Sequence, residues 1–281
     1  MSERKEKFVG YIDILGFTSM VEASEAGTGL PLDELLKLVA LLDPSNSGQK
    51  YTETGKHICP HSAHIAKDLD FRITQVSDCV IVSAEISPAG MINLVHHCWI
   101  AVLGLLANGL LCRGYITCGL ILHTTDNVIG TGYQRAIAGE KDVTAFKTEA
   151  DERGTPYVEV DRLVCDYAKT HGDECTKKMF GRFTKDTGEG VALFPFKRLA
   201  IQFGIGGSFP PFNAQEQLDS NENVRKWIAD LKKRVMAHAN IKNSDAMRKI
   251  EHYMRALDEQ LKVSDRMEGI IRELSERPIR P

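Results

Sequence analysis

The sequence has few cysteines, and none of them lies at a spacing typical of disulfide frameworks or zinc knuckles. The seven cysteines are odd in number and scattered from Cys59 to Cys175, and no CxxC pair occurs. Secreted disulfide scaffolds pair an even number of cysteines, whereas cytosolic proteins keep their thiols reduced. We therefore expect a cytoplasmic protein with free thiols.

Positive charge is not in excess. Lysine and arginine total 35 against 38 aspartates and glutamates, which gives a net charge of −3 at neutral pH. A protein that binds long nucleic acids through their phosphates is usually basic. The composition therefore argues against nucleic-acid binding, whereas a small anionic ligand held at one local site is compatible with it.

Long apolar runs are missing as well. No window reaches the roughly 18 apolar residues of a membrane span. The charged start MSERKEK leads into an apolar segment that is too short and too acidic for a signal peptide. Hydrophobic residues make up 43% and aromatic residues 7% of the chain. These are values of an ordinary globular protein, and we expect no membrane association.

Residues 1–208 carry a pattern of strands and helices that favours an α+β fold. The predicted strands span residues 8–15, 71–76, 80–84, 113–123, 157–160 and 193–196. The first predicted helix has Thr18 or Ser19 as its N-cap. Further predicted helices span residues 30–42, 89–111, 130–140 and 161–169. A strand followed by helices and an antiparallel hairpin predicts a mainly antiparallel sheet with helices on one face.

The remaining chain, residues 209–281, has a different composition. Segments 213–240 and 244–276 are charged but place apolar side chains such as Ile250 and Leu257 at helical spacing. The Gly- and Pro-rich sequence GIGGSFPPF precedes them. We predict a C-terminal helical pair that follows a separate catalytic domain.

Two aspartates lie where the predicted strands end. Asp13 interrupts an otherwise apolar strand, and Asp78 lies in the turn of the predicted hairpin. Burying a lone carboxylate is costly unless it is paired or binds a metal, and strands disfavour Asp. If the first strand lies beside the hairpin, both carboxylates meet at one edge of the sheet. Together with the carbonyl of Ile14 they offer the oxygen ligands that Mg²⁺ or Mn²⁺ prefers.

A glycine turn follows the first aspartate. Gly16, Phe17 and Thr18 would present backbone N–H groups at the start of a helix, which is a favourable place for a phosphate. Carboxylates, a divalent metal and a phosphate cradle together describe a site for a nucleoside triphosphate.

Four segments resemble the motifs of class III nucleotidyl cyclases, in the order in which that family carries them. YIDILGFT at residues 11–18 is similar to the first metal motif, F-x-D-I-x-G-F-T. VSDCV at 76–80 resembles the second metal motif. CRGYITCG at 112–119 resembles the later R-x-G-I-x-x-G strand, and GTGYQRAIAGE at 130–140 the helix motif G-x-x-V-N-x-A-x-R-x-E. The first motif is the most specific of the four.

This resemblance implies a ferredoxin-like catalytic domain that works as a head-to-tail homodimer with shared sites. It implies Mg²⁺ or Mn²⁺, two ions per site, bound by Asp13, Asp78 and the Ile14 carbonyl. The implied reaction is attack of the ribose 3′-hydroxyl on the α-phosphate, which yields a 3′,5′-cyclic nucleotide and pyrophosphate. One ion would lower the pKa of the 3′-hydroxyl and the other would hold the β- and γ-phosphates.

The sequence departs from the purine cyclases at the residues that read the base. Thr74 and Asn127 stand where those enzymes carry a Lys and an Asp. Both are short and neutral, so the charged purine contacts are missing, but both offer donors and acceptors to a smaller base. Tyr51, in the loop before the hairpin, is a candidate for stacking on the base.

The helix motif departs from the family as well. The residues that align with its transition-state Asn and Arg are Gln134 and Ala138. Gln134 could still donate to a phosphate, but Ala138 cannot. Arg113, Arg135 and Lys141 are the candidates to supply the missing cation, and Arg113 is the first choice because it opens the strand after the long helix.

Metal motifs without purine readers are similar to those of the bacterial pyrimidine cyclases of the Pycsar antiphage system. That resemblance implies synthesis of cyclic UMP, or of cyclic CMP as the second choice, and a separate effector that responds to the cyclic nucleotide. Two alternatives stay open. One is an adenylate or guanylate cyclase with unusual base contacts, and the other is a degenerate cyclase domain that senses a nucleotide without converting it.

One further cluster, His57, Cys59, His61 and His64, lies in a single continuous loop. Structural zinc sites usually draw their ligands from two separated segments, and we assign no zinc to this loop.

Overall fold

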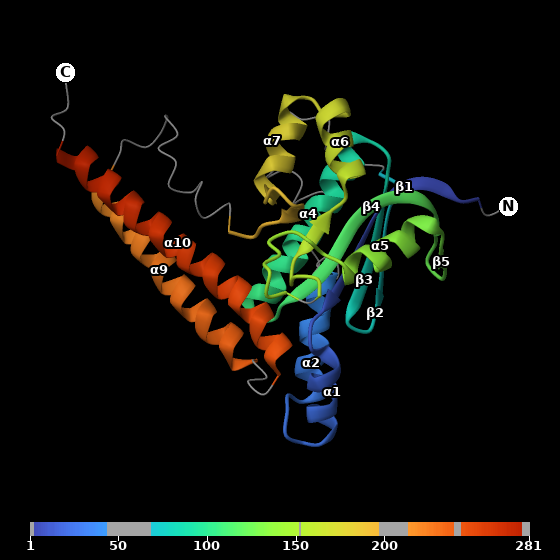
Figure 1. The fold of residues 1–281 in the computed structure, drawn as a ribbon, viewed down its shortest axis with the longest axis horizontal. Helices are drawn as coiled ribbons and strands as arrows, with labels where there is room; N and C mark the ends of the chain where they lie inside the picture. The colour runs from blue at the N-terminus through green and yellow to red at the C-terminus, as the bar shows by residue number, and fades with distance from the viewer. Residues whose placement is uncertain (1–2, 44–68, 152, 197–212, 239–242, 277–281) are drawn as a thin grey trace. The chain divides into compact units, whose positions relative to one another are not determined.

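A computed structural model describes residues 3–43, 69–151, 153–196, 213–238 and 243–276, and Figure 1 shows their fold. The chain divides into two compact units, residues 1–195 and 196–281. The boundary predicted at residue 208 falls outside the described residues.

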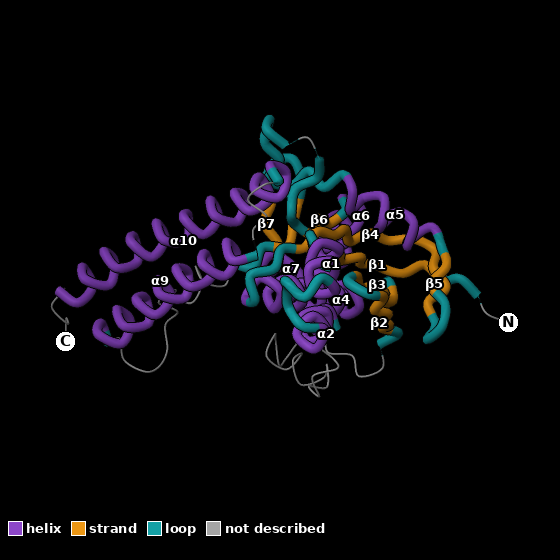
Figure 2. The backbone as a smooth tube through the Cα atoms, turned by 90° about the horizontal axis from the view of Figure 1, so that it is seen from below, coloured by secondary structure: helices purple, strands orange, loops and turns teal. Residues whose placement is uncertain are grey.

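The first unit is built on one sheet of eight strands. They are β1 (Lys5–Ile14), β2 (Phe71–Val76), β3 (Cys79–Glu85), β4 (Cys112–His123), β5 (Val128–Ile129), β6 (Val158–Val160), β7 (Thr184–Asp186) and β8 (Val191–Leu193). Their order is β2-β3-β1-β4-β6-β8-β7, with β5 paired to β4. Strands β2, β3, β1 and β4 follow one another side by side in Figure 2. Only the β4–β6 pair among the described strands is parallel, so the predicted α+β class with a mainly antiparallel sheet is confirmed.

The helices of this unit are α1 (Phe17–Glu25), α2 (Leu32–Val39), the short η1 (Ala40–Leu42), α4 (Pro88–Ala107), α5 (Thr131–Lys141), α6 (Arg162–His171) and α7 (Glu174–Phe183). Most of the predicted helices and strands are present. The described elements that the sequence pattern missed are α7, β5 and β7, and the last predicted strand, 193–196, is shifted to β8.

Strand β1 is central because its side chains are apolar on both faces. Successive side chains of a strand point to opposite faces. Phe8 and Ile12 therefore join the core that contains α4, whereas Val9 packs with Ala136 of α5. Helices thus cover both faces of the sheet. The expectation of helices on one face was wrong, because the second apolar face of β1 also needs a cover.

Helix α4 is the main core helix. Ser87 caps its start by accepting a hydrogen bond from the N–H of Gly90. Of the described helices, α4 alone has the length and the mean hydropathy, 1.6, of a membrane span, but 83% of that window is buried inside the protein. Trp99 of this helix is 2% exposed and donates its indole N–H to the carbonyl of Phe194. A segment that lies 95 positions after Trp99 in the sequence thus covers part of the helix.

The described part of the second unit contains α9 (Ala214–Ala237) and α10 (Ser244–Glu276), which run side by side in Figures 1 and 2. The predicted helical pair is therefore confirmed. The amide of Asn221 donates to the carbonyl of Ser264, and Arg225 forms ion pairs with Asp265 and Glu268 across the two helices. These contacts fix the register of one helix against the other.

Candidate active site

The two aspartates of the predicted metal site lie at the edge of the sheet that is formed by the end of β1 and the turn between β2 and β3. Asp13 is the penultimate residue of β1 and pairs with Cys79 of β3, directly after Asp78. The backbone N–H of Ile14 donates to the carbonyl of Asp78 at 3.0 Å. The sheet therefore brings together the residues that the sequence separates by more than 60 positions.

The electrostatic surroundings of Asp13 are strongly acidic. Partial burial, followed by the charges of Asp78 and Glu140, raises the pKa of its carboxyl to about 7, whereas the charge of Arg113 acts in the opposite direction. Two carboxylates and one guanidinium thus act on the Asp13 carboxyl. An additional positive charge at this point would stabilise ionised Asp13, which is the property expected of a cation site.

Arg113 lies opposite Asp13 in the β1–β4 pairing. Its guanidinium contacts Glu140 of α5 at 2.5 Å, and the two side chains are 14% and 6% exposed. In the sequence, Glu140 stands out only as part of a motif, and its pairing with Arg113 was not predicted. Arg113 therefore has a buried partner in its own chain, and its role as the catalytic cation stays a prediction.

The phosphate cradle begins at Gly16, whose φ of 79° lies in the left-handed region that favours glycine. Helix α1 starts directly afterwards, at the buried Phe17. No side chain caps this end of the helix, so the N-cap predicted at Thr18 or Ser19 was wrong: both residues lie inside the first turn. The backbone N–H groups of that turn therefore have no side-chain cap beside the carboxylate edge.

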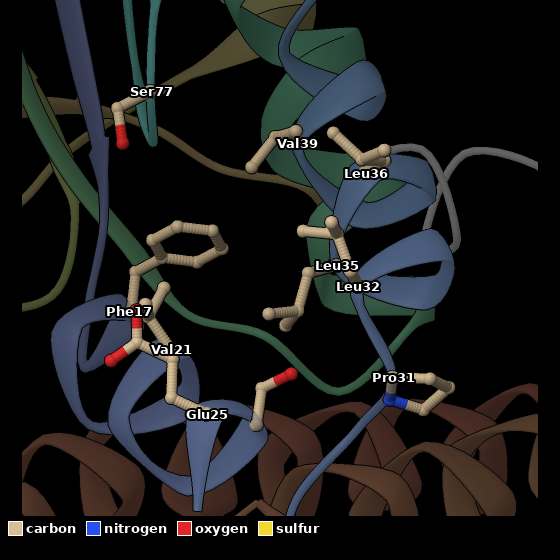
Figure 3. Close-up of a pocket in the computed structure, with 10 residues that line it drawn as sticks. Phe17, Val21, Glu25, Pro31, Leu32, Leu35, Leu36, Val39 and Ser77 are labelled. Carbon is tan, nitrogen blue, oxygen red and sulfur yellow. The ribbon is translucent and has the colours of Figure 1, made fainter.

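An apolar pocket adjoins Phe17. Its volume is about 510 Å³, and most of its lining comes from α1 and α2. Figure 3 shows the ring of Phe17 and the side chains of Leu35 and Val39 facing it, with Ser77 at one end. Such an apolar lining does not suit a triphosphate.

One predicted base reader, Thr74, contacts the far end of β4, and the other, Asn127, lies in the turn after that strand. Thr74 Oγ1 lies 2.9 Å from Nε2 of His123, the last residue of that strand. Asn127 is exposed in the turn that follows, where its N–H donates to Thr124 Oγ1 and its carbonyl accepts from the N–H of Thr124. No pattern in the sequence indicated His123. The third candidate for the base, Tyr51, lies outside the described residues.

Helix α5 presents a polar, exposed face. Gln134, Ala138 and Lys141 are exposed and lie on the same side of the helix, since four and three residues correspond to about one turn. Arg135 is also exposed, but its guanidinium donates to the carbonyl of Cys118. Of the three candidate cations, Lys141 is therefore the one that shares a face with Gln134.

The described residues contain no cluster of three or more His, Cys, Asp or Glu side chains around one point. The side chain of Glu140 is bound to Arg113. The candidate protein ligands at the edge of the sheet are therefore the carboxylates of Asp13 and Asp78 and the carbonyl of Ile14. Mg²⁺ is usually bound by one or two carboxylates, with water and substrate phosphates completing its coordination, and this small set fits that pattern.

Comparison of the chain with protein-family models and with curated proteins found no match.

Proposed function

We propose that this protein is a pyrimidine nucleotide cyclase, which converts UTP, or CTP as the second choice, to the 3′,5′-cyclic nucleotide and pyrophosphate. One observation carries the proposal: Asp13 and Asp78 lie side by side at the sheet edge, next to the uncapped start of α1. A divalent cation and a triphosphate need this combination of carboxylates and backbone N–H groups.

The connectivity of the first unit supports the proposed ferredoxin-like fold. The chain passes from β1 through α1 and α2 to β2 and β3, and then through α4 to β4. The four strands are ordered β2-β3-β1-β4. This is a βαββαβ arrangement. Asp13 lies on the central strand β1, and Asp78 lies in the turn directly before β3, the other central strand. The resemblance of the sequence motifs to class III cyclases leads to the same fold independently of the coordinates.

Asp13, Asp78 and the Ile14 carbonyl would hold Mg²⁺ or Mn²⁺. The metal would lower the pKa of the 3′-hydroxyl and would neutralise phosphate charge. The excess of carboxylates around Asp13 fits such a cation. In the reaction, a bond forms between the 3′-oxygen and the α-phosphorus, and the bond from that phosphorus to the bridging oxygen breaks. Pyrophosphate leaves with the electron pair, and the hydroxyl proton passes to solvent.

The chain's own groups position the nucleotide. The N–H groups of Phe17 and Thr18 would donate to the phosphates, and Arg113 would keep Glu140 from competing for the cation. The neutral pair Thr74 and Asn127 would contact the base through hydrogen bonds, which suits a pyrimidine better than the charged readers of purine cyclases do. Positioning and charge neutralisation are the main requirements of such phosphoryl chemistry.

A shared site between two copies of the chain is part of the proposal. Gln134 and Lys141 lie on the exposed face of α5, away from the Asp13 carboxylate that α5 approaches through Glu140. We infer that this face supplies the amide and the cation to the site of a partner chain. A homodimer with head-to-tail sites would then contain two complete sets of groups. In the antiphage setting that the resemblance implies, a separate effector would respond to the product.

One observation favours a second candidate, a domain that senses a nucleotide without converting it. The family's transition-state arginine aligns with Ala138, which has no charge. A single assay separates the candidates: incubation of the purified protein with ATP, GTP, CTP or UTP and Mn²⁺, followed by chromatography of the products. We expect a cyclic pyrimidine nucleotide. Product from ATP or GTP would favour the purine alternative, and binding without product would favour the sensor.

A further inference from the structure

A buried polar chain crosses the face of the sheet next to the predicted base readers. Nδ1 of His123 lies 2.8 Å from Ser83 Oγ, and Nε2 of the same ring lies 2.9 Å from Thr74 Oγ1. Ser83 is fully buried and His123 is 6% exposed. Thr74 is only half-buried, so the chain has one end that reaches the surface, directly beside the turn that carries Asn127.

Polar groups in such a position need a reason. A hydroxyl–imidazole–hydroxyl chain contributes less to packing than apolar side chains of similar size, and every member must be hydrogen-bonded to avoid a penalty. The neighbouring positions on this face, Val9, Ile81 and Ile121, are buried and apolar. Lys7, two positions before Val9 on the same face of β1, is also buried and forms an ion pair with Asp70.

The ring of His123 is neutral at physiological pH. Burial is the first cause, followed by the positive charges of Lys7 and Arg72, and together they lower its pKa to about 4, although Asp70 acts in the opposite direction. A neutral imidazole has one N–H donor and one acceptor nitrogen. It can therefore donate to only one of its two hydroxyl partners and must accept from the other.

The position of the ring proton decides what Thr74 offers to a ligand. With the proton on Nε2, the ring donates to Thr74 Oγ1, and the Thr74 hydroxyl hydrogen is free to donate outwards. With the proton on Nδ1, the ring donates to Ser83, and Thr74 donates inwards to Nε2. Towards a ligand, the Thr74 oxygen can then act only as an acceptor. Hydroxyl groups tolerate both arrangements because they both donate and accept.

We propose that His123 is a positioning residue that sets, through its tautomer, whether Thr74 reads a donor or an acceptor on the pyrimidine base. This inference rests on the proposed function. At the position where the pyrimidines differ, uracil presents a carbonyl acceptor and cytosine an amino donor, as thymine O4 and cytosine N4 do in DNA. The Nε2–H form therefore suits UTP, and the Nδ1–H form suits CTP.

Ser83→Ala gives the proposal a directional test. Without Ser83 Oγ, a proton on Nδ1 would be a buried, unpaired donor, which is more costly than an unpaired acceptor nitrogen. The ring proton should move to Nε2, from which it donates a hydrogen bond to Thr74 Oγ1. The ratio of kcat/KM for UTP to that for CTP should then rise by about fivefold to tenfold, the effect of one hydrogen bond. The same substitution in a Thr74→Val background should leave the ratio unchanged, because the proposed effect of the His123 ring on the base passes through the Thr74 hydroxyl.

A structural role of the polar chain would give a different result. Equal losses for UTP and CTP in Ser83→Ala, or a change of ratio that persists in the Thr74→Val background, would overturn the proposal. His123→Phe provides a second variant: it removes both ring contacts, and whichever base is preferred should lose its advantage.

A readout without turnover separates this inference from the proposed function. The ring nitrogens of His123 are followed by ¹⁵N NMR during titration with uridine and with cytidine, which cannot be cyclised. We expect the Nε2–H form to increase with uridine and the Nδ1–H form with cytidine. If no triphosphate is converted but these shifts occur, the cyclase proposal fails and the tautomer proposal stands. If neither nucleoside moves the resonances, the tautomer proposal is overturned whatever the turnover.

Discussion

The carbonyl of Asp78 accepts a hydrogen bond of 3.0 Å from the backbone N–H of Ile14. This bond ties the end of β1 to the turn of the β2–β3 hairpin, so that two carboxylates distant in sequence share one edge of the sheet. The arrangement is made by backbone groups and does not depend on the aspartate side chains. Those side chains can therefore be replaced while the geometry of the edge is kept.

For catalysis, we predict that Asp13→Asn and Asp78→Asn each lower cyclase turnover by at least about a hundredfold, because each removes a charged ligand for the cation. The substitutions keep side-chain volume and leave the Ile14–Asp78 backbone bond intact. Far-UV circular dichroism and turnover of UTP with Mn²⁺ check this prediction. Near-native turnover by either folded variant would rule out the proposed site.

Stability should depend on pH through Asp13. Its pKa is about 7 in the folded protein, above the ordinary value, so the folded state holds the proton more tightly than the unfolded state. The contribution is most favourable below pH 4 and is lost as the pH rises towards 7. The loss should amount to about 2 kcal/mol after allowance for partial solvent exposure.

Urea unfolding at pH 5 and pH 8 measures this loss. Asp13→Asn should flatten the pH dependence, whereas Asp33→Asn on the exposed start of α2 should not. Mn²⁺ should restore stability at pH 8 in the wild type but not in Asp13→Asn, because a cation that binds only the folded state stabilises it. An unchanged slope in Asp13→Asn would show that this carboxyl is not the titrating group.

Arg113 and Glu140 should behave as a buried pair. Arg113→Met leaves the Glu140 carboxylate buried without its partner and should cost about 3 kcal/mol of unfolding free energy. The double variant Arg113→Met with Glu140→Leu should recover most of this loss, because it removes both charges. Chemical denaturation of the wild type, the two single variants and the double variant forms a complete double-mutant cycle. Additive losses would contradict the pairing.

Lys141 should act across a dimer interface. Lys141→Ala should reduce turnover strongly, whereas Lys147→Ala, an exposed lysine beyond the end of α5, should not. Mixing inactive Asp13→Ala chains with inactive Lys141→Ala chains should restore partial activity, since one of the two heterodimer sites would be complete. If chain exchange is verified and activity stays at zero at every mixing ratio, the two groups do not belong to different chains of one site.

The base preference can be tested at Thr74 and Asn127. Installing the purine readers by Thr74→Lys with Asn127→Asp should lower kcat/KM for UTP and CTP by roughly tenfold or more, because charged groups would replace the neutral contacts to the pyrimidine. Steady-state kinetics with all four triphosphates check this, with Thr125→Lys in the exposed part of the same turn as the control. Unchanged pyrimidine turnover would remove these residues from the base site.

Local sequence signals were sufficient for much of the fold. The apolar run that became β1, the β-prone segments on either side of Ser77 and Asp78, and the helical spacing of α9 and α10 depend on neighbours within a few residues. Helix α7 was missed although Asp173 caps its first turn by accepting from the N–H of Thr176. That cap was a readable signal, since Asp is a preferred N-cap residue.

The site contacts were less accessible to sequence reasoning because they depend on long-range packing. Asp13 and Asp78 could be paired in advance, since a hairpin beside the first strand brings them together. The Arg113–Glu140 ion pair requires α5 to dock on the sheet. His123 reaches Thr74 across 49 positions, and nothing local to either residue indicates the contact.

The hydrogen bond from Trp99 to Phe194 has a consequence for how the chain folds during synthesis. The core helix α4 leaves the ribosome long before residues 184–194, which help to cover it, have been made. Until then, the apolar surface of α4, one of the most apolar segments of the protein, is not completely buried. Chains truncated before residue 194 should therefore aggregate or recruit chaperones, and the fluorescence of Trp99 should report when the last strands close over the helix.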